Sequence, residues 1–481
     1  MLLVCVQLIM SELKSLLLKN FPFAPTAGQA ALVIRLAEFF EDVEKRKLFV
    51  LKGYAGTGKT TFTNTLIKSL SSVQLKFSLL APTGRAAKVL GNYTQHQAQT
   101  IHRKIYQVKQ DKFGKTQSVL KENKHTSTLF IVDEASMIGN SETEGDSAYS
   151  QNNLLDDLFQ FVYSGKNCFL MFIGDVAQLP PVKLAISPAL NIDYLRFEYG
   201  VKLYTHELKD VVRQQKDSGI LLNATALRIL INRAETLPVL KAVGFDDVHS
   251  LYGNDVEEAF SNTFNPKHLD DNIVICRSNK QANRYNQFIR NNYLGQTDEI
   301  SAGDQLMVLK NNYFWLPDDS VAGFIANGDV IEIRSLLNIE EHFGFRFADA
   351  RIKLIDYPDE EELVVKLLLD TIYAETPALS FTESRKLWDE ILASHASEKN
   401  LKEKMEQVRG SEYYNALQVK FAYAVTCHKA QGGQWKNVFI DQGYMTEENY
   451  TTEHLRWLYT AVSRATENLF YVNFDEKFFR K

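Results

Sequence analysis

The residues best suited to chemistry form a glycine-rich loop at positions 53–60, Gly-Tyr-Ala-Gly-Thr-Gly-Lys-Thr. This G-x-x-x-x-G-K-[ST] pattern lies between an apolar run at 48–51 and a helix-like segment at 61–70. Such glycines let backbone N–H groups surround phosphates, while the lysine reaches the β- and γ-phosphate oxygens and the threonine hydroxyl ligates magnesium. We therefore predict ATP and Mg²⁺ as cofactors. The expected loop contacts are Gly53, Ala55, Gly56, Thr57, Gly58, Lys59, Thr60 and Thr61.

Two carboxylates follow a second apolar run, at 129–132. Phosphoryl transfer depends mainly on charge neutralisation and on the position of the attacking water. We expect Asp133 to join Thr60 as a magnesium ligand and Glu134 to polarise the water. An apolar run that ends in Asp-Glu is a weak signal alone, but it gains weight after a phosphate loop.

Three further polar residues complete the predicted catalytic set. Gln178 follows a third apolar run, at 169–173, and would sense the γ-phosphate; the alternative is a polar turn ended by two prolines. Arg213 and Arg464 are candidates for charge compensation from a second lobe, and the alternative for each is a solvated surface group. An arginine finger contributes about 10³–10⁵ in rate and acts only when the lobes are closed.

The elements around these residues predict an α/β fold. Apolar runs alternate with helix-like stretches, and each run ends in a polar or glycine-rich turn, as in a parallel sheet that binds ligands at the carboxyl ends of its strands. Strands are also expected at 273–276, 438–441 and 469–473. A Lys/Gln-rich hairpin at about 103–127 interrupts the first half. A charged segment at 336–412, helix-like from 383 to 408, interrupts the second.

Composition limits the class of protein. The net charge of −5 over 481 residues gives no global basic field and disfavours a nonspecific nucleic-acid coat protein. Four widely spaced cysteines form no C-x-x-C pair, which disfavours a zinc ribbon or a disulfide framework. No segment approaches 18 uninterrupted apolar residues, and the apolar run at 1–10 lacks the features of a signal peptide. We expect a cytoplasmic protein with no membrane partner.

Further motifs accompany the nucleotide site along the chain. They are Gln29 upstream of the loop, Ala-Pro-Thr-Gly-Arg-Ala-Ala at 81–87, Thr-Ile-His at 100–102, Asp-Glu-Ala-Ser at 133–136, Gly-Asp-Val-Ala-Gln-Leu-Pro-Pro at 174–181, Arg-Ser-Asn-Lys-Gln-Ala-Asn at 277–283, Gly-Asp at 303–304, Asn-Asn-Tyr at 311–313, Asn-Gly-Asp at 327–329, Tyr-Ala-Val-Thr-Cys-His-Lys-Ala-Gln-Gly at 423–432 and Tyr-Thr-Ala-Val-Ser-Arg-Ala at 459–465. In this order they resemble the motifs of superfamily 1 DNA helicases of the RecD/Dda type.

The resemblance implies two RecA-like P-loop NTPase lobes with a small insertion in each. The implied boundaries are 1–205 for the first lobe, 206–335 with 413–481 for the second, and 336–412 for an insertion that is SH3-like plus helical. It implies that Gln29 reads adenine and that the protein moves 5′ to 3′ on single-stranded DNA. The DNA-contacting residues expected from motif position or residue type are Thr83, Arg85, His102, Phe113, Tyr313, Thr426 and His428.

Alternatives remain for several of these residues. The two histidines could be structural, and Tyr313 could be a core residue. Phe113 lies at the polar tip of the expected hairpin, where it would separate the DNA strands or belong to a plain solvated loop.

The predicted function is an ATP-dependent helicase that unwinds DNA as a monomer at duplex junctions, with repair, recombination or replication proteins as partners. The alternatives are an ATPase switch stimulated by nucleic acid and the motor subunit of a helicase–nuclease complex. The nearest nuclease-like sequence, Pro358-Asp359 followed by Lys366, lacks a second carboxylate. Single-stranded RNA remains open as a substrate, because stacking and phosphate contacts do not distinguish the sugars.

Overall fold

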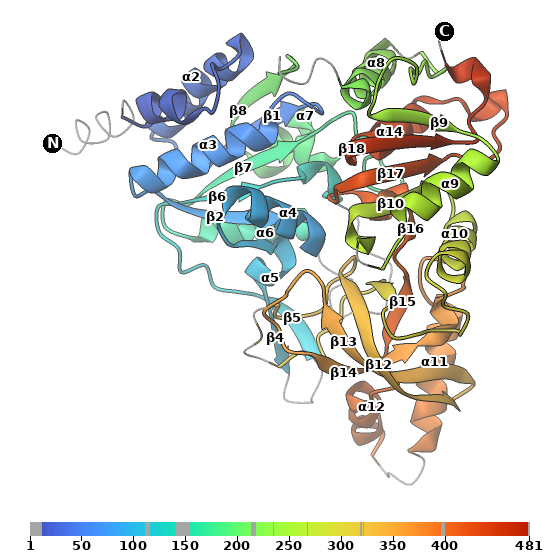
Figure 1. The fold of residues 1–481 in the computed structure, drawn as a ribbon. Helices are drawn as coiled ribbons and strands as arrows, with labels where there is room; N and C mark the ends of the chain where they lie inside the picture. Colours follow the sequence, from blue (N-terminus) through green and yellow to red (C-terminus); the bar gives the residue numbers. More distant parts are fainter. Residues whose placement is uncertain are drawn as a thin grey trace.

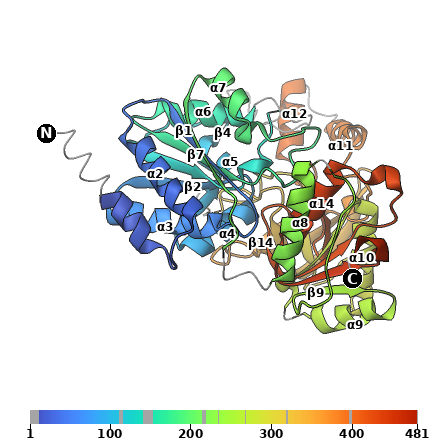
Figure 2. The same ribbon diagram turned by 90° about the horizontal axis from the view of Figure 1, so that it is seen from above.

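Two parallel-sheet lobes lie side by side, and a small barrel lies below the second lobe (Figure 1; from above, Figure 2). The computed structural model describes residues 12–110, 116–140, 153–212, 218–233, 235–266, 268–317, 320, 322–395 and 400–479. Over this part of the chain, no helix has the length and apolar character needed to cross a membrane.

The first lobe is built on a six-stranded parallel sheet in the order β3-β2-β6-β7-β1-β8. Its strands are β1 Lys47–Gly53, β2 Lys76–Ala81, β3 Ala98–Thr100, β6 Thr128–Val132, β7 Phe169–Gly174 and β8 Lys202–Leu208. Its helices are α2 Ala27–Glu41, α3 Lys59–Ser72, α4 Gly84–Thr94, α5 Ile101–Ile105, α6 Leu154–Ser164 and α7 Ile192–Tyr199, preceded by a helix at 12–20.

The central strands of this sheet are almost wholly apolar because both of their faces are covered. One core cluster joins the sheet to α2 and α3, and a second joins it to α5, α6 and α7. All residues of β6 are buried. Since parallel strands point the same way, the turns after β1, β6 and β7 lie at one edge, where the predicted nucleotide residues are found.

The second lobe has a five-stranded parallel sheet in the order β16-β10-β17-β18-β9. Its strands are β9 Val248–Leu251, β10 Asn272–Cys276, β16 Ala424–Thr426, β17 Trp435–Asp441 and β18 Ala465–Val472. Its helices are α8 Gly219–Arg233, α9 Asn254–Thr263, α10 Asn279–Asn292, α13 Cys427–Ala430 and α14 Thr452–Val462.

Each lobe carries an insertion. In the first, β4 Tyr106–Gln110 and β5 Thr116–Leu120 form an antiparallel hairpin. In the second, β11 Gln305–Val308, β12 Val330–His342, β13 Phe345–Leu354, β14 Leu363–Leu368 and β15 Leu417–Phe421 close a barrel. Helices α11 Phe381–Ser394 and α12 Leu401–Gly410 pack beside it through an apolar cluster. Short 3-10 turns occur at Ala135–Met137, Pro188–Leu190, Leu269–Asp271, Leu369–Thr371, Glu447–Asn449 and Glu476–Phe478.

The predicted α/β class with two RecA-like lobes is confirmed, and each apolar run that was expected to form a strand lies in a strand of a parallel sheet. The structure draws the boundaries differently from the expected ones. The position 205 falls inside β8, which pairs with β1 in the first sheet. The barrel extends beyond 336–412 because β11 and β15, outside that range, pair with each other and close it. The expected helix at 383–408 is two helices, α11 and α12.

Three of the cysteines, Cys168, Cys276 and Cys427, are buried free thiols. The fourth, Cys5, lies outside the described residues.

Candidate nucleotide and nucleic-acid sites

The phosphate loop joins β1 to α3 in the geometry that an anion site requires. Gly56 and Gly58 adopt left-handed conformations, with φ of 72° and 83°, and Gly58 caps the N-terminus of α3. Lys59 begins the helix, and its Nζ donates to the carbonyls of Gly53 (2.6 Å) and Tyr54 (2.9 Å). The N–H groups at the helix N-terminus and the helix dipole favour phosphate here.

Gln29 packs against this loop from α2. It is buried, and it forms a capping box with Thr26 at the start of the helix. Its Nε2 lies 3.5 Å from the Thr57 carbonyl, to which it donates. A Cβ on Gly58 would lie 2.5 Å from the same nitrogen, so a side chain there would displace Gln29. The structure thus places Gln29 beside the loop, and its contact with adenine stays a prediction.

Carboxylates line the neighbouring strand ends. Glu134 follows β6 with a left-handed φ of 52°, and its N–H donates to Asp133 Oδ1 at 2.9 Å. Burial, together with the charge of Glu134, raises the pKa of Asp133. Asp175, at the end of β7, is 1% exposed and lies 3.6 Å from Lys59 Nζ. A lysine and three carboxylates therefore meet at one edge of the sheet.

This donor set fits a magnesium ion. Hard cations prefer carboxylate and hydroxyl oxygens, which Asp133 and the exposed Thr60 offer. The raised pKa of Asp133 shows that the site disfavours its negative charge, and a divalent cation would stabilise the ionised form.

The second lobe brings Arg464 to the carboxylates. Its Nη1 lies 3.8 Å from Glu134 Oε1, and the side chain is only 4% exposed. The guanidinium also donates to the carbonyls of Gly433 and Thr460, both at 3.1 Å. These bonds hold a fixed positive charge next to the residue expected to polarise water.

The turn after β7 is bound by the second lobe through its backbone. The Leu179 N–H donates to the Thr460 hydroxyl at 2.8 Å, and Gln431 donates to the Leu179 carbonyl at 2.8 Å. Arg456 donates to the carbonyls of Val176 and Gln178. The Gln178 side chain is buried, and its Oε1 has no hydrogen-bond partner within the described structure. The second lobe therefore holds the turn that carries Gln178, and the role of Gln178 as a γ-phosphate sensor stays a prediction.

The candidate DNA residues of the first lobe are at the ends of α4 and α5. The Thr83 side chain caps α4 and accepts from the Ala86 N–H at 3.2 Å. Arg85 lies 4.1 Å above the ring of Trp435 in the other lobe. The His102 ring lies 5.8 Å from that of Tyr106, and burial lowers its pKa to about 4, so it is neutral at neutral pH.

The candidates of the second lobe are near α13 and in the loop after β11. Thr426 ends β16, and the exposed His428 follows on α13. The Tyr313 ring lies 4.7 Å from that of Phe324, so it packs within its own loop. Arg213 and Phe113 lie outside the described residues, and their roles stay predictions, as do all the DNA contacts.

Two family models match the chain: an AAA domain over residues 38–184 and a UvrD-like helicase C-terminal domain over residues 421–472. The ATP-dependent DNA helicase dda of Enterobacteria phage T4 is 28% identical over 89% of this chain. The ATP-dependent RecD2 DNA helicase of Deinococcus radiodurans is 33% identical over 33% of it. Together these matches support a superfamily 1 helicase of the RecD/Dda branch.

The chain spans 95% of the length of Dda, but only 19% of RecD2 and 37% of an uncharacterized archaeal relative. Among solved structures, the structure of this chain is similar to that of a Pif1 helicase from Bacteroides in complex with ADP-AlF3 and single-stranded DNA. The similarity covers 93% of each chain at 14% identity, with a TM-score of 0.43.

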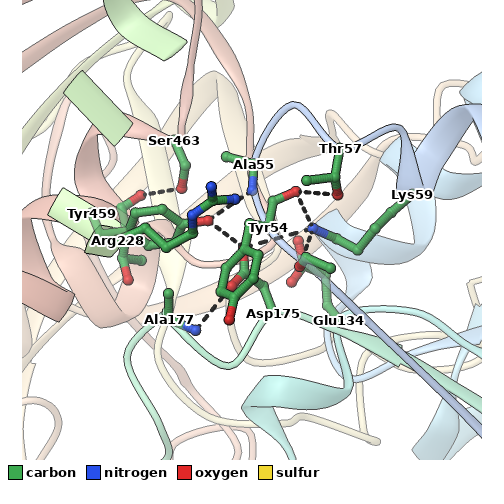
Figure 3. Close-up of polar contacts among 12 residues, drawn as sticks. Tyr54, Ala55, Thr57, Lys59, Glu134, Asp175, Ala177, Arg228, Tyr459 and Ser463 are labelled. Atoms are coloured by element: carbon green, nitrogen blue, oxygen red, sulfur yellow. Dashed lines mark hydrogen bonds and ion pairs between the residues drawn. The ribbon is translucent and has the colours of Figure 1, made fainter. Parts of the chain in front are cut away.

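Sequence reasoning missed two residues of this protein that contact the phosphate loop from the second lobe (Figure 3). The Arg228 guanidinium, on α8, lies 4.5 Å from the centre of the Tyr54 ring, whose hydroxyl donates to Glu207 at 2.8 Å. The hydroxyl of Tyr459, on α14, accepts from the Ala55 N–H at 2.7 Å. Arg228 has no motif around it that could have revealed it. Tyr459 begins the last motif, whose arginine alone was assigned a role.

Proposed function

We propose that this helicase is an ATP-driven motor that moves 5′ to 3′ along single-stranded DNA and unwinds duplex DNA at junctions. The observation that carries the proposal is the joint between the phosphate loop and α14, 404 residues apart in sequence at Ala55 and Tyr459. Arg464 extends this joint to Glu134. A nucleotide held by one lobe and contacted by the other can change the position of the lobes, and a motor requires that coupling.

Within the site, the loop N–H groups and Lys59 hold the phosphates of ATP. Thr60 and Asp133 hold Mg²⁺, which neutralises charge on the phosphates when bound. Glu134 orients the attacking water, and Gln178 senses the γ-phosphate. Arg464 stabilises the charge that develops on the transferred phosphoryl group, with Arg213 as a second arginine from the same lobe.

The DNA strand crosses both lobes on the surface formed by α4, α5 and α13. Thr83 and Thr426 meet phosphates, and the neutral ring of His102 stacks on a base, which is worth about 1–3 kcal/mol. His428, Arg85 and Tyr313 are the other proposed contacts, with Phe113 as the residue that separates the strands. We propose that the protein acts as a monomer in the cytoplasm, with repair, recombination or replication proteins as partners.

The first test is steady-state ATP hydrolysis without nucleic acid, with single-stranded DNA, and with RNA of the same sequence. We expect DNA to stimulate turnover strongly and Lys59→Ala to abolish it. Lys68→Ala, at an exposed lysine of α3 outside the loop, is the matched control. Equal rates with and without nucleic acid would overturn the motor and leave an ATPase switch. Stimulation by RNA alone would overturn the DNA assignment.

The direction of movement needs a separate test. Duplexes with a single-stranded tail on either the 5′ or the 3′ side are incubated with the helicase and ATP, and strand release is followed over time. A 5′-to-3′ motor releases the strand only when the tail is on the 5′ side of the duplex. Release from 3′-tailed duplexes instead would reverse the proposed polarity.

A further inference from the structure

A buried tyrosine of the second lobe forms hydrogen bonds with two parts of the nucleotide site. Tyr459 is fully buried, although its side chain extends from α14 into the first lobe. Its hydroxyl accepts from the Ala55 N–H at 2.7 Å and donates to Asp175 Oδ2 at 2.5 Å (Figure 3). One phenol therefore joins the phosphate loop to the turn after β7.

The Asp175 carboxylate is shared among three groups. Its Oδ1 accepts from the Ala177 N–H at 2.9 Å, and its Oδ2 accepts from Tyr459. The same Oδ2 lies 3.6 Å from Lys59 Nζ, beyond hydrogen-bond distance but within range for a strong charge interaction. Lys59 instead donates to two carbonyls of the loop.

The Tyr459 hydroxyl keeps its proton in this environment. Burial and the negative charge of Asp175 raise the pKa of Tyr459 well above its usual value. It is therefore a permanent donor to the carboxylate. A donor of this kind stabilises the charge of Asp175 and so weakens the pull of that charge on Lys59.

We propose that Tyr459 is a positioning residue of the nucleotide site: by holding Asp175, it keeps Lys59 available to the phosphates of ATP. Without the hydroxyl, Asp175 would turn to the lysine ammonium and compete with the phosphates for it. Because Tyr459 moves with the second lobe, the hold on Asp175 depends on lobe closure. This inference rests on the proposed ATPase function and assigns a further residue to it.

The test is a double-mutant cycle on nucleotide affinity, which isolates the coupling between two residues. The Kd of a non-hydrolysable ATP analogue is measured for the wild type, Tyr459→Phe, Asp175→Asn and the double variant. Tyr471→Phe is the matched control, because this second-lobe tyrosine is also fully buried and its hydroxyl has no hydrogen-bond partner in the described structure. Thermal unfolding of each variant checks its folding.

We expect Tyr459→Phe to weaken analogue binding by about tenfold, the usual size for a lost hydrogen bond to a charged group. In the Asp175→Asn background the same change should have a much smaller effect, since the competing charge is gone and only the bond from the Ala55 N–H is lost. In turnover assays, Tyr459→Phe should raise the KM for ATP more than it lowers kcat. Tyr471→Phe should bind like the wild type.

If Tyr459→Phe changes the Kd of the analogue equally in the wild-type and Asp175→Asn backgrounds, the inference is overturned. Tyr459 would then have only a packing role. If Tyr459→Phe does not fold, the affinity of Asp175→Asn for the ATP analogue tests the inference alone. Tighter binding than in the wild type supports competition between Asp175 and the phosphates for Lys59, and weaker binding overturns it. A wild type that binds no ATP analogue would instead contradict the proposed function, together with this inference. The two failures are therefore distinguishable.

Discussion

At the residue scale, the nucleotide site depends on charges that are buried in fixed positions. Arg464 reaches the carboxylates of the other lobe because its position is fixed on both sides. It lies between the end of α14 and the start of β18, and its guanidinium donates to the Gly433 carbonyl. A solvated arginine would lose side-chain entropy to reach the same place, whereas this one is already ordered.

Replacing Arg464 by alanine should reduce kcat about 10³-fold, because the transition state loses its compensating charge. Affinities for the ATP analogue and for single-stranded DNA should stay within about a factor of three of the wild type, if the residue acts only in the transition state. Single-turnover hydrolysis and equilibrium binding measure the two effects. The control is Arg196→Ala, at an exposed arginine of α7. Loss of ATP binding would instead mark Arg464 as a structural residue.

A buried histidine should make the unfolding free energy of this protein depend on pH. His454, on α14, is 4% exposed and lies 3.1 Å from Gln442 Oε1 through its Nε2. Burial, reinforced by the positive charge of Arg277, lowers its pKa from 6.5 to about 4. Between these pH values the unfolded chain binds a proton that the folded chain does not. The contribution of His454 to the free energy of unfolding is therefore fully present above pH 6.5 and falls as the pH drops towards 4.

The His454→Gln variant should lose this pH dependence. Between pH 7 and pH 5 the wild type should lose about 2 kcal/mol of unfolding free energy that the variant keeps. Urea unfolding at the two pH values measures the difference. The same loss in both proteins would show that other groups dominate the acid response.

At the element scale, the start of α4 is packed against the barrel. Gly84 faces the buried carboxyl of Asp329, and a Cβ at this position would clash with Asp329 Oδ1. Burial raises the pKa of Asp329 to about 8, so the group is mostly protonated at neutral pH. Nearby, Lys88 of the same helix forms an ion pair with Asp356 at 2.9 Å. The proposed DNA surface on α4 therefore depends on the position of the barrel.

Gly84→Ala should separate α4 from the barrel or strain both, with a loss of about 1–3 kcal/mol in unfolding free energy. Single-stranded DNA affinity should fall as well, since Thr83 is the neighbouring residue. Gly410→Ala is the matched control, because nothing lies within 4 Å of a Cβ at that glycine. Urea unfolding and fluorescence anisotropy of labelled DNA report the two effects. A variant as stable as the wild type would show that the contact between position 84 and Asp329 adjusts without loss of unfolding free energy.

At the scale of the whole molecule, the two lobes share a continuous apolar core. Tyr54, Ala177 and Leu179 of the first lobe belong to the same buried cluster as residues of α8, α14 and the second sheet. The lobes are also joined farther along the interface, where Arg85 stacks on Trp435. The proposed nucleotide and DNA sites therefore lie at two places on one interface, and movement of the lobes would affect both.

Trp435 should report this movement. The protein has four tryptophans, so replacing Trp315, Trp388 and Trp457 by phenylalanine leaves Trp435 as the single probe. We expect its fluorescence to change when the ATP analogue binds, and to change further with single-stranded DNA, because the Arg85 stack and the solvent around the ring are altered. An unchanged signal at saturating ligand would show that this part of the interface stays closed.

The sequence by itself determined the chemistry of the first lobe. Gly53 to Thr60 form a local motif, and the apolar runs before it and before Asp133 and Gln178 allow only buried parallel strands. Strand ends in such a sheet meet at one edge, so the residues that follow them are brought together without further information.

Only the tertiary structure decided which residues reach this edge from elsewhere. Tyr459 and Arg228 contact the loop because two separate sheets meet at a particular angle, and no local pattern encodes that angle. The predicted boundaries of the barrel were wrong for the same reason. Strands β11 and β15 are short, and they belong to the barrel only because they pair with each other across about a hundred residues. Contacts of long sequence separation depend on the whole fold, whereas the phosphate loop depends on its own eight residues.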